Sequence, residues 1–183
     1  MLTVILLKSH ISDPSKKKSK PKQSKERLDI THQCILALID SPACKSGNLR
    51  ILIQTVENVL LEINPIMRVP RTLERFLGLF PKLFKERKIM NEKKEYLIRI
   101  LKNDLRENMN PGTLKIGLSK DGNKIDKSLF VNKDITIFLN ADQNSEDVFE
   151  EEEMRVKLSD FDLSAFVCCV KICSLYEEAN DIF

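Results

Sequence analysis

Short aliphatic runs alternate along this chain with apolar residues at helical spacing, and this alternation limits the possible folds more than any other feature. The strand-like runs are rich in β-branched and aliphatic residues and lie between turn residues, at 49–55, 59–64, 113–118 and 134–139. The helical patterns repeat every three or four residues and occupy 28–40, 73–84, 92–102 and 163–179. Because strands and helices alternate, the sequence predicts an α/β protein.

Individual residues predict where several of these elements begin and end. Asp29 is placed to cap the first helix, which ends near 40–42, and Asp162 is placed to cap the last helix. Pro81 predicts a kink or a break in the second helix, because proline removes a backbone hydrogen bond. Residues 56–58 are typical of the turn of a hairpin. On the last helix, the spacing predicts that these side chains are buried: Leu163, Phe166, Val167, Val170 and Leu175.

Length and composition predict one globular domain over residues 1–183. A chain of 183 residues with 42% hydrophobic and 31% charged residues can form a single core. Its apolar runs are far shorter than the roughly 20 residues that a membrane span needs, so we expect a soluble, intracellular protein without membrane contact. The five cysteines show neither zinc spacing nor a disulfide framework, which predicts reduced, buried thiols and no metal site.

Charge is distributed unevenly, although the net charge is only +3. Residues 9–26 combine many lysines with Ser, Pro and Gln and have almost no apolar side chain to bury. We expect a mobile basic loop there. Such a loop would bind a polyanion such as RNA through counterion release, or serve as a nuclear or nucleolar address, and the composition suits both interpretations.

Two sequence blocks resemble a known family. The block Arg27-Leu-Asp-Ile-Thr-His-Gln-Cys-Ile-Leu-Ala-Leu-Ile-Asp-Ser-Pro42 is followed by Leu61-Glu-Ile-Asn-Pro65 and Arg68-Val-Pro-Arg-Thr-Leu-Glu-Arg-Phe-Leu-Gly78. They are similar to the marker segments of the eukaryotic ribosome-biogenesis methyltransferases that modify N1 of a pseudouridine in small-subunit ribosomal RNA. Weaker similarity at 100–103, 115–117 and 158–165 extends the resemblance over nearly the whole chain.

This resemblance implies a fold, a partner set and a location. The fold would be of the SPOUT type, an α/β sheet with flanking helices and a C-terminal trefoil knot, here in a shortened form. The knot region would also form a homodimer interface. The implied partners are small-subunit rRNA and pre-ribosomal assembly factors, the implied cofactor is S-adenosylmethionine, and the implied location is the nucleolus.

The same resemblance assigns roles to charged residues. Arg68, Arg71 and Arg75 match the family's RNA-binding arginines, and we expect them along one edge of a helix that Pro70 opens. The alternative is a solvated helix face paired with Glu74. Methylation at N1 requires loss of a proton or stabilisation of an anion. The residues that the resemblance assigns to this step are Asp40 and Arg27, with Asp29 organising the helix start and His32 as a structural residue.

The cofactor loop departs from the family pattern. Where the family has a glycine-bearing loop, this chain has Asn140-Ala-Asp-Gln-Asn-Ser145 and then an acidic run at 146–153. Asparagine can replace glycine in backbone conformation, although it cannot give glycine's close approach to a ligand. Two hypotheses follow: an active methyltransferase, or an assembly factor that keeps rRNA binding and dimerisation without methyl transfer. The resemblance places these residues at the cofactor: Gly117, Leu139, Asn140, Ala141, Ser145, Leu158, Leu163, Ser164 and Ala165.

Overall fold

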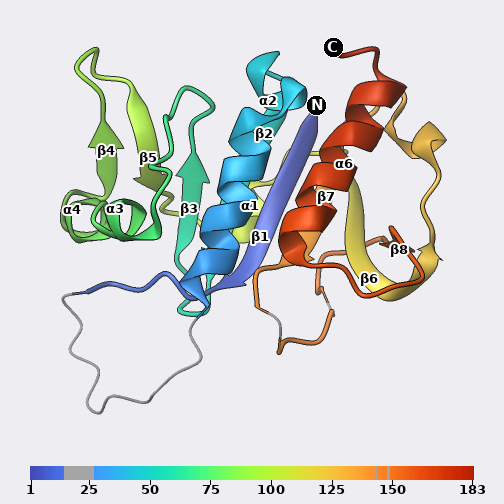
Figure 1. Ribbon diagram of the computed structural model, residues 1–183, viewed down its shortest axis with the longest axis horizontal. Helices are drawn as coiled ribbons and strands as arrows, with labels where there is room; N and C mark the ends of the chain where they lie inside the picture. The colour runs from blue at the N-terminus through green and yellow to red at the C-terminus, as the bar shows by residue number, and fades with distance from the viewer. Residues whose placement is uncertain (15–26, 143, 148) are drawn as a thin grey trace.

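The computed structural model describes residues 1–14, 27–142, 144–147 and 149–183 (Figure 1). Its sheet has eight strands in the order β4-β5-β3-β2-β1-β7-β6-β8. The strands are β1 (Leu2–Ser9), β2 (Leu49–Thr55), β3 (Leu60–Ile63), β4 (Lys88–Met90), β5 (Tyr96–Ile100), β6 (Leu114–Lys124), β7 (Ile135–Asn140) and β8 (Met154–Lys157). The helices are α1 (Leu28–Asp40), α2 (Pro42–Lys45), α3 (Leu73–Leu77), α4 (Phe80–Glu86), α5 (Leu105–Asn108), the short 3₁₀ helix η1 (Lys127–Phe130) and α6 (Ala165–Ala179).

The centre of the sheet is parallel and buried on both faces. β1 pairs in parallel with β2 on one side and with β7 on the other, and β7 pairs in parallel with β6. All six residues of β7 are buried, as expected for a parallel strand covered on both sides. At the β4 end the pairing becomes antiparallel, through β2, β3, β5 and β4. The prediction of an α/β fold is confirmed.

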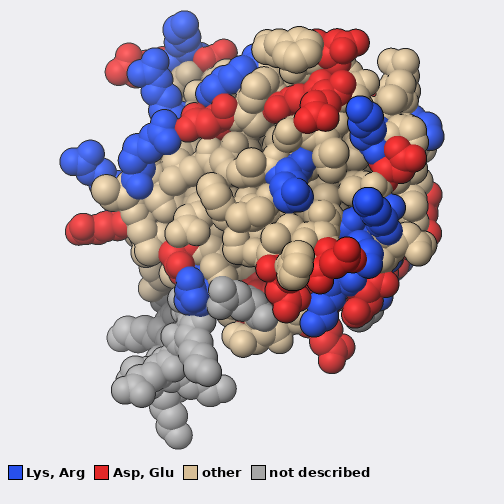
Figure 2. Space-filling view, turned by 45° about the vertical axis from the view of Figure 1, so that its right-hand side comes forward, with Lys and Arg blue, Asp and Glu red and all other residues tan. Residues whose placement is uncertain are grey.

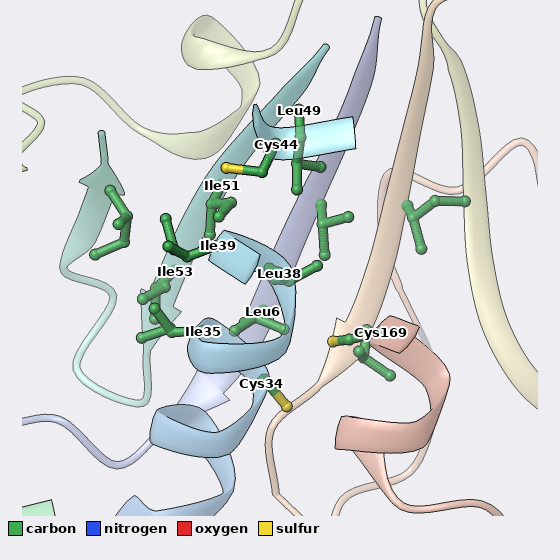
Figure 3. Packing of buried hydrophobic residues seen from close by; sticks show 14 of the residues in the cluster. Leu6, Cys34, Ile35, Leu38, Ile39, Cys44, Leu49, Ile51, Ile53 and Cys169 are labelled. Atoms are coloured by element: carbon green, nitrogen blue, oxygen red, sulfur yellow. The ribbon is translucent and has the colours of Figure 1, made fainter. Parts of the chain in front are cut away.

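Helices α1 and α6 pack side by side on one face of the sheet (Figure 1). Ile35, Leu38 and Ile39 of α1 lie against the aliphatic side chains of β1 and β2 (Figure 3). The buried residues of α6 are Cys169, Ile172, Cys173 and Tyr176. Burying an aliphatic side chain stabilises the fold by about 1.5–3 kcal/mol, so this layer fixes α1 firmly on the strands.

All five cysteines are free, which confirms the prediction of reduced thiols. Cys34 of α1 and Cys169 of α6 lie at the contact between the two helices (Figure 3). Burial raises the pKa of Cys173 to about 12 and that of Cys168 to about 11. These thiols therefore stay protonated at neutral pH and act as small apolar groups.

The helix predicted at 92–102 is wrong, because this segment completes a β-hairpin. β4 and β5 are antiparallel, with a β-bulge between Ile89 and Met90. In the turn, Asn91 bonds Glu95, and Lys94 has a φ of 62°. A bulge interrupts the side-chain alternation of a strand, so this strand can carry apolar residues at 97, 98 and 100 that do not alternate. Their spacing is similar to that of a helix, which explains the wrong prediction.

Other boundaries agree with the sequence only in part. The break at Pro81 is confirmed, since α3 and α4 are separate and Pro81 lies in the first turn of α4. The antiparallel hairpin around 56–58 is also confirmed. However, the cap of α6 is Ser164, whose Oγ accepts a hydrogen bond from the Val167 amide, and not Asp162.

The buried face of α6 differs from the predicted one. Phe166 and Val170, which we expected in the core, are 39% and 46% exposed. The reason is that Cys169, Ile172 and Cys173 face the sheet instead, so the helix is rotated relative to the expected phase. The apolar residues of α6 thus occupy two faces, and only one of them packs on the sheet.

The expected basic loop at 9–26 falls mostly on residues 15–26, which lie outside the described residues. Its first part is ordered, because Ser9 ends β1 and Ile11 is buried. Within the described part of the chain, no helix is long and apolar enough to cross a membrane.

Candidate functional site

A groove of about 940 Å³ lies beyond the carboxyl ends of the central parallel strands. In open α/β sheets this edge is where ligands bind, because the loops that leave the strands surround an open crevice there. Its walls come from five parts of the chain: the second half of β6, the end of β7 with residues 142 and 144–147, the end of β8 with the loop 158–164, the start of α6, and the start of α1. The groove contains most of the predicted cofactor residues: Leu139, Asn140, Ser145, Leu158, Leu163, Ser164 and Ala165.

Two predicted cofactor residues do not line the groove. Ala141 is fully buried in the core. Gly117 lies under the acidic segment, where a Cβ atom would collide with the carboxylate of Glu152 and the ring of Phe149. Glycine at this position therefore allows that segment to pack on the sheet. Glycine is therefore required at position 117 for packing and not for contact with the cofactor.

Asn140 has one polar side-chain atom without a hydrogen-bond partner among the described residues. This residue is 7% exposed, and its Nδ2 donates to the Glu146 carbonyl at 3.0 Å and to Asp147 Oδ1 at 2.9 Å. Its Oδ1 is buried and has no hydrogen-bond partner among the described residues. A buried acceptor without a partner costs about 1–3 kcal/mol. A ligand that offers an N–H or O–H group to this atom would recover that energy.

The wall beside Asn140 is acidic. Asp142 accepts hydrogen bonds from the Asn144 amide at 3.1 Å and from Ser145 Oγ at 2.9 Å, and its carboxylate lies 3.7 Å from His10. Burial opposes the ionisation of Asp142, but these interactions outweigh burial and lower its pKa. Asp142 is therefore ionised at neutral pH. Together with Asp147 it gives the groove a negative wall that suits a cationic ligand.

Arg27 lines the groove at the start of α1 and is held by Asp29. Its Nε and Nη2 donate to the two carboxylate oxygens of Asp29, each at 2.8 Å. The hydrogen bond from Arg27 lowers the pKa of Asp29, so the carboxyl stays ionised. Asp29 does not cap the helix, because no side chain forms a cap hydrogen bond there. The side chain of Asp29 fixes the guanidinium of Arg27 instead.

Asp40 lies at the other end of α1 and does not meet Arg27. α1 contains 13 residues, and a rise of about 1.5 Å per residue separates its ends by roughly 20 Å. Asp40 is instead 2.9 Å from Nη1 of Arg71 and 3.9 Å from Nζ of Lys45. The expected pair of Asp40 and Arg27 is thus not assembled, and the carboxylate beside Arg27 is Asp29. The sequence contained a signal for the Arg27–Asp29 pair, because the two residues are only two positions apart at the start of a predicted helix.

The three predicted RNA-binding arginines are all exposed, on the segment that leads into α3. α3 begins after Thr72, so Arg68 and Arg71 precede it and only Arg75 is helical. The expectation that Pro70 opens the helix is wrong. None of the three pairs with Glu74 among the ion pairs of the described residues, and Arg71 pairs with Asp40.

His32 attaches this arginine segment to α1. Its Nε2 donates to the carbonyl of Pro70 at 2.7 Å, and its ring stacks on Phe76 with 4.7 Å between the centroids. Phe76 is fully buried and packs edge-on against Phe80. The structural role predicted for His32 is confirmed.

The outer surface formed by α1 and α6 is apolar. Phe166 and Val170 of α6 are exposed, and Leu36 and Ala37 of α1 are half-buried. Figure 2 shows few charged side chains across the middle of the face that these helices form. We call these four residues the α1–α6 surface.

A family model described as "EMG1/NEP1 methyltransferase" matches residues 3–177. The chain belongs to the EMG1/NEP1 methyltransferase family. The "Ribosomal RNA small subunit methyltransferase NEP1" of Candida albicans is 38% identical over 165 residues, which are 86% of this chain and 62% of that protein. The human protein of the same name is 33% identical over 156 residues, or 83% of this chain and 64% of that protein. This chain thus spans less than two thirds of the length of these relatives.

The fold agrees with the family. The crystal structure of Archaeoglobus fulgidus Nep1 bound to S-adenosylhomocysteine matches 97% of both chains with a TM-score of 0.80 and 22% identity. The SPOUT-type sheet with flanking helices, implied by the sequence blocks, is therefore confirmed. The sequence did not reveal Asp142 as part of the groove, although it lies only two residues after Asn140 in the altered loop.

Proposed function

We propose that this protein is an S-adenosylmethionine-dependent methyltransferase that modifies N1 of a pseudouridine in small-subunit rRNA during ribosome biogenesis. The observation that carries the proposal is the groove, which is lined both by Asn140, with its unpaired acceptor, and by Arg27, which Asp29 holds from outside the groove. The family's names and the ligand of the archaeal relative support the same chemistry. The alternative of an assembly factor without methyl transfer is not favoured, because the altered loop leaves the groove open.

The groove residues fit the cofactor. Asn140 Oδ1 would accept a hydrogen bond from its amino or hydroxyl groups, and the backbone of 158–164 would line its other side. The ionised Asp142 would favour its positive charge, and Asp147 adds a second acidic side chain to the same wall. When bound, S-adenosylmethionine supplies an electrophilic methyl group on a positively charged sulfur.

Arg27 would stabilise the target base. The guanidinium remains charged at all relevant pH values, so it favours the uracil ring in the form that has lost its N1 proton. Asp29 keeps the guanidinium in place through two hydrogen bonds. Because its pKa is lowered, Asp29 is a weak base, so we propose that solvent, and not Asp29, accepts the N1 proton of the uracil ring.

Arg68, Arg71 and Arg75 would bind the phosphates that flank this base. They are exposed cations on a segment fixed to α1 through His32 and Pro70. Guanidinium groups bind phosphate oxygens with two hydrogen bonds, which suits this role. The basic residues of 9–26 would add a salt-dependent contribution to RNA affinity and a nucleolar address.

We further propose a homodimer formed through the α1–α6 surface, with the C-terminal trefoil knot implied by the sequence resemblance. Support comes from Phe166 and Val170 of α6, which expose apolar side chains. Light scattering at micromolar concentration would give the mass of two chains. A Val170→Asp variant should shift that mass to one chain. We also propose that the protein binds pre-ribosomal assembly factors.

Two measurements test the function. Calorimetric titration should show binding of S-adenosylhomocysteine, and an Arg27→Gln variant should keep this binding while losing methyl transfer to an rRNA fragment that contains the pseudouridine. Mass spectrometry of the fragment would report the added methyl group. No binding at millimolar S-adenosylhomocysteine, or full transfer by the Arg27→Gln variant, would contradict the proposal.

A further inference from the structure

Opposite ends of the sheet carry opposite charge. Residues 82–102, which include α4, β4 and β5, contain eight Lys and Arg against three Glu. Residues 141–162, which include β8, contain two Lys and Arg against nine Asp and Glu. β4 and β8 are the two edge strands of the sheet, so the excess charges lie as far apart as the sheet allows (Figure 1). In Figure 2 basic side chains project from the upper left edge, on the side of β4 and β5.

The two faces of the β4–β5 hairpin differ. Ile89 and Ile98 are paired across the strands and buried in the core, on the side that α4 covers. Lys88 and Met90, which alternate with Ile89, are exposed on the other face. Arg99 is the cross-strand neighbour of Lys88 and lies on this same open face.

Arg99 and Tyr96 form a platform on the open face. The guanidinium carbon of Arg99 lies 4.2 Å from the centre of the Tyr96 ring. The carboxylate of Glu62 in β3, which is 5% exposed, accepts hydrogen bonds from Nε of Arg99 at 2.6 Å and from Nε of Arg50 at 2.8 Å. One carboxylate thus positions two arginines and neutralises only one charge. A guanidinium fixed over an aromatic ring is the kind of surface on which unpaired bases stack.

The lysines around this platform are available to a partner. Lys88, Lys93 and Lys94 are exposed and form no ion pair among the described residues of the hairpin. The other cations of this end continue along α4 toward the predicted RNA-binding arginines, since α3 and α4 are separated by only two residues. The hairpin therefore extends the basic surface that begins at Arg68.

We propose that the open face of the β4–β5 hairpin is a second RNA-binding surface, which takes a single-stranded segment of the RNA through Lys88, Lys93, Lys94, Tyr96 and Arg99. The lysines would contact phosphates, and the Arg99–Tyr96 platform would stack an unpaired base. The inference rests on the proposed function, because it adds length to the same RNA contact. It places the surface outside the groove, so cofactor binding does not depend on it.

The test compares two triple variants of the full chain with equal loss of charge. The first is Lys88→Ala with Lys93→Ala and Lys94→Ala, and the control is Lys124→Ala with Lys127→Ala and Lys133→Ala, all exposed residues on the β6 side of the sheet. The affinity for a single-stranded rRNA fragment is measured between 50 and 200 mM salt, chosen as about the range where such binding weakens steeply. The hairpin variant should bind more weakly, with a slope of log affinity against log salt reduced by about two to three.

Several outcomes would overturn the inference. One is an unchanged salt slope in the hairpin variant, and another is an equal reduction of the slope in the control variant. The third is a hairpin variant that still binds RNA but no longer binds an acidic peptide, which would indicate a protein partner for this surface. A Tyr96→Leu variant tests the platform, since it should reduce the preference for single-stranded over duplex RNA. Calorimetry with S-adenosylhomocysteine separates this result from the proposed function, because both triple variants should bind it like the unmodified protein.

Discussion

Replacement of Asn140 by alanine tests the cofactor groove most directly. The change removes the hydrogen bond from Nδ2 to the Glu146 carbonyl, worth about 0.5–1.5 kcal/mol, and the bond to the Asp147 carboxylate, worth about 1.5–3 kcal/mol. Both anchor the loop 141–147 to the end of β7. Removal of the buried, unpaired Oδ1 recovers about 1–3 kcal/mol, so we expect the free energy of unfolding to fall by only about 1 kcal/mol, which lowers Tm by roughly 2–4 °C in a domain of this size. A domain with about 5–15 kcal/mol of stability remains folded after this loss.

The same substitution also removes the unpaired Oδ1 from the groove. A ligand N–H or O–H that would have bonded this atom is left unsatisfied, at a cost of about 1–2 kcal/mol, or roughly five- to thirtyfold in Kd. Thermal unfolding gives the loss of stability, and calorimetric titration with S-adenosylhomocysteine at 15 °C gives the loss of affinity. Asn123→Ala is the control, because Asn123 has an exposed side chain and does not line the groove. If Asn140→Ala binds S-adenosylhomocysteine as tightly as the control does, Asn140 does not contact the cofactor.

Three further predictions concern the ends of α1 and the groove thiol. Asp29→Asn should reduce methyl transfer. In the unmodified protein, the contribution of the Arg27–Asp29 pair to the free energy of unfolding should be constant above the ordinary carboxyl pKa near 4 and should disappear as the pH falls through the lowered pKa of Asp29. A titration of stability against pH would show this loss. Asp40→Asn should leave cofactor affinity unchanged, because Asp40 lies roughly 20 Å from Arg27; a calorimetric loss greater than about threefold would place Asp40 at the groove after all. Cys168, whose pKa is raised to about 11, should be alkylated slowly at pH 8 and faster as the pH approaches 11, and rapid modification at pH 7 in intact-mass measurements would contradict its protonated state.

The sequence predicts an element best where its local signals agree with its packing. The helix at 28–40 has an uninterrupted apolar stripe, and it forms with those bounds. The break at Pro81 follows from the covalent structure of proline, so no tertiary contact could remove it. The hairpin at 88–100 is missed because its bulge gives three aliphatic residues a helical spacing, and only pairing with β3 reveals the strand.

The candidate site shows a similar limit. The sequence blocks identified residue types and a family, and most of the residues assigned to the cofactor do line one groove. They could not show that α1 separates Arg27 from Asp40, since distance in the fold depends on the helix between them. Gly117 was assigned to the cofactor from its residue type, whereas its space is filled by Glu152. Such packing arises between segments far apart in the chain and leaves no local signal.

The length of α1 would set a spacing on the RNA in the proposed complex. One end of this rigid helix carries Arg27 in the groove, and the other carries Asp40 in contact with Arg71. In the proposed binding mode, the modified base and the phosphate held at Arg71 are roughly 20 Å apart, a distance that about five or six stacked nucleotides span. In that binding mode, α1 would select a base by its distance from the phosphate bound at Arg71. Insertion of one helical turn into α1 would move the selected position by about one to two nucleotides.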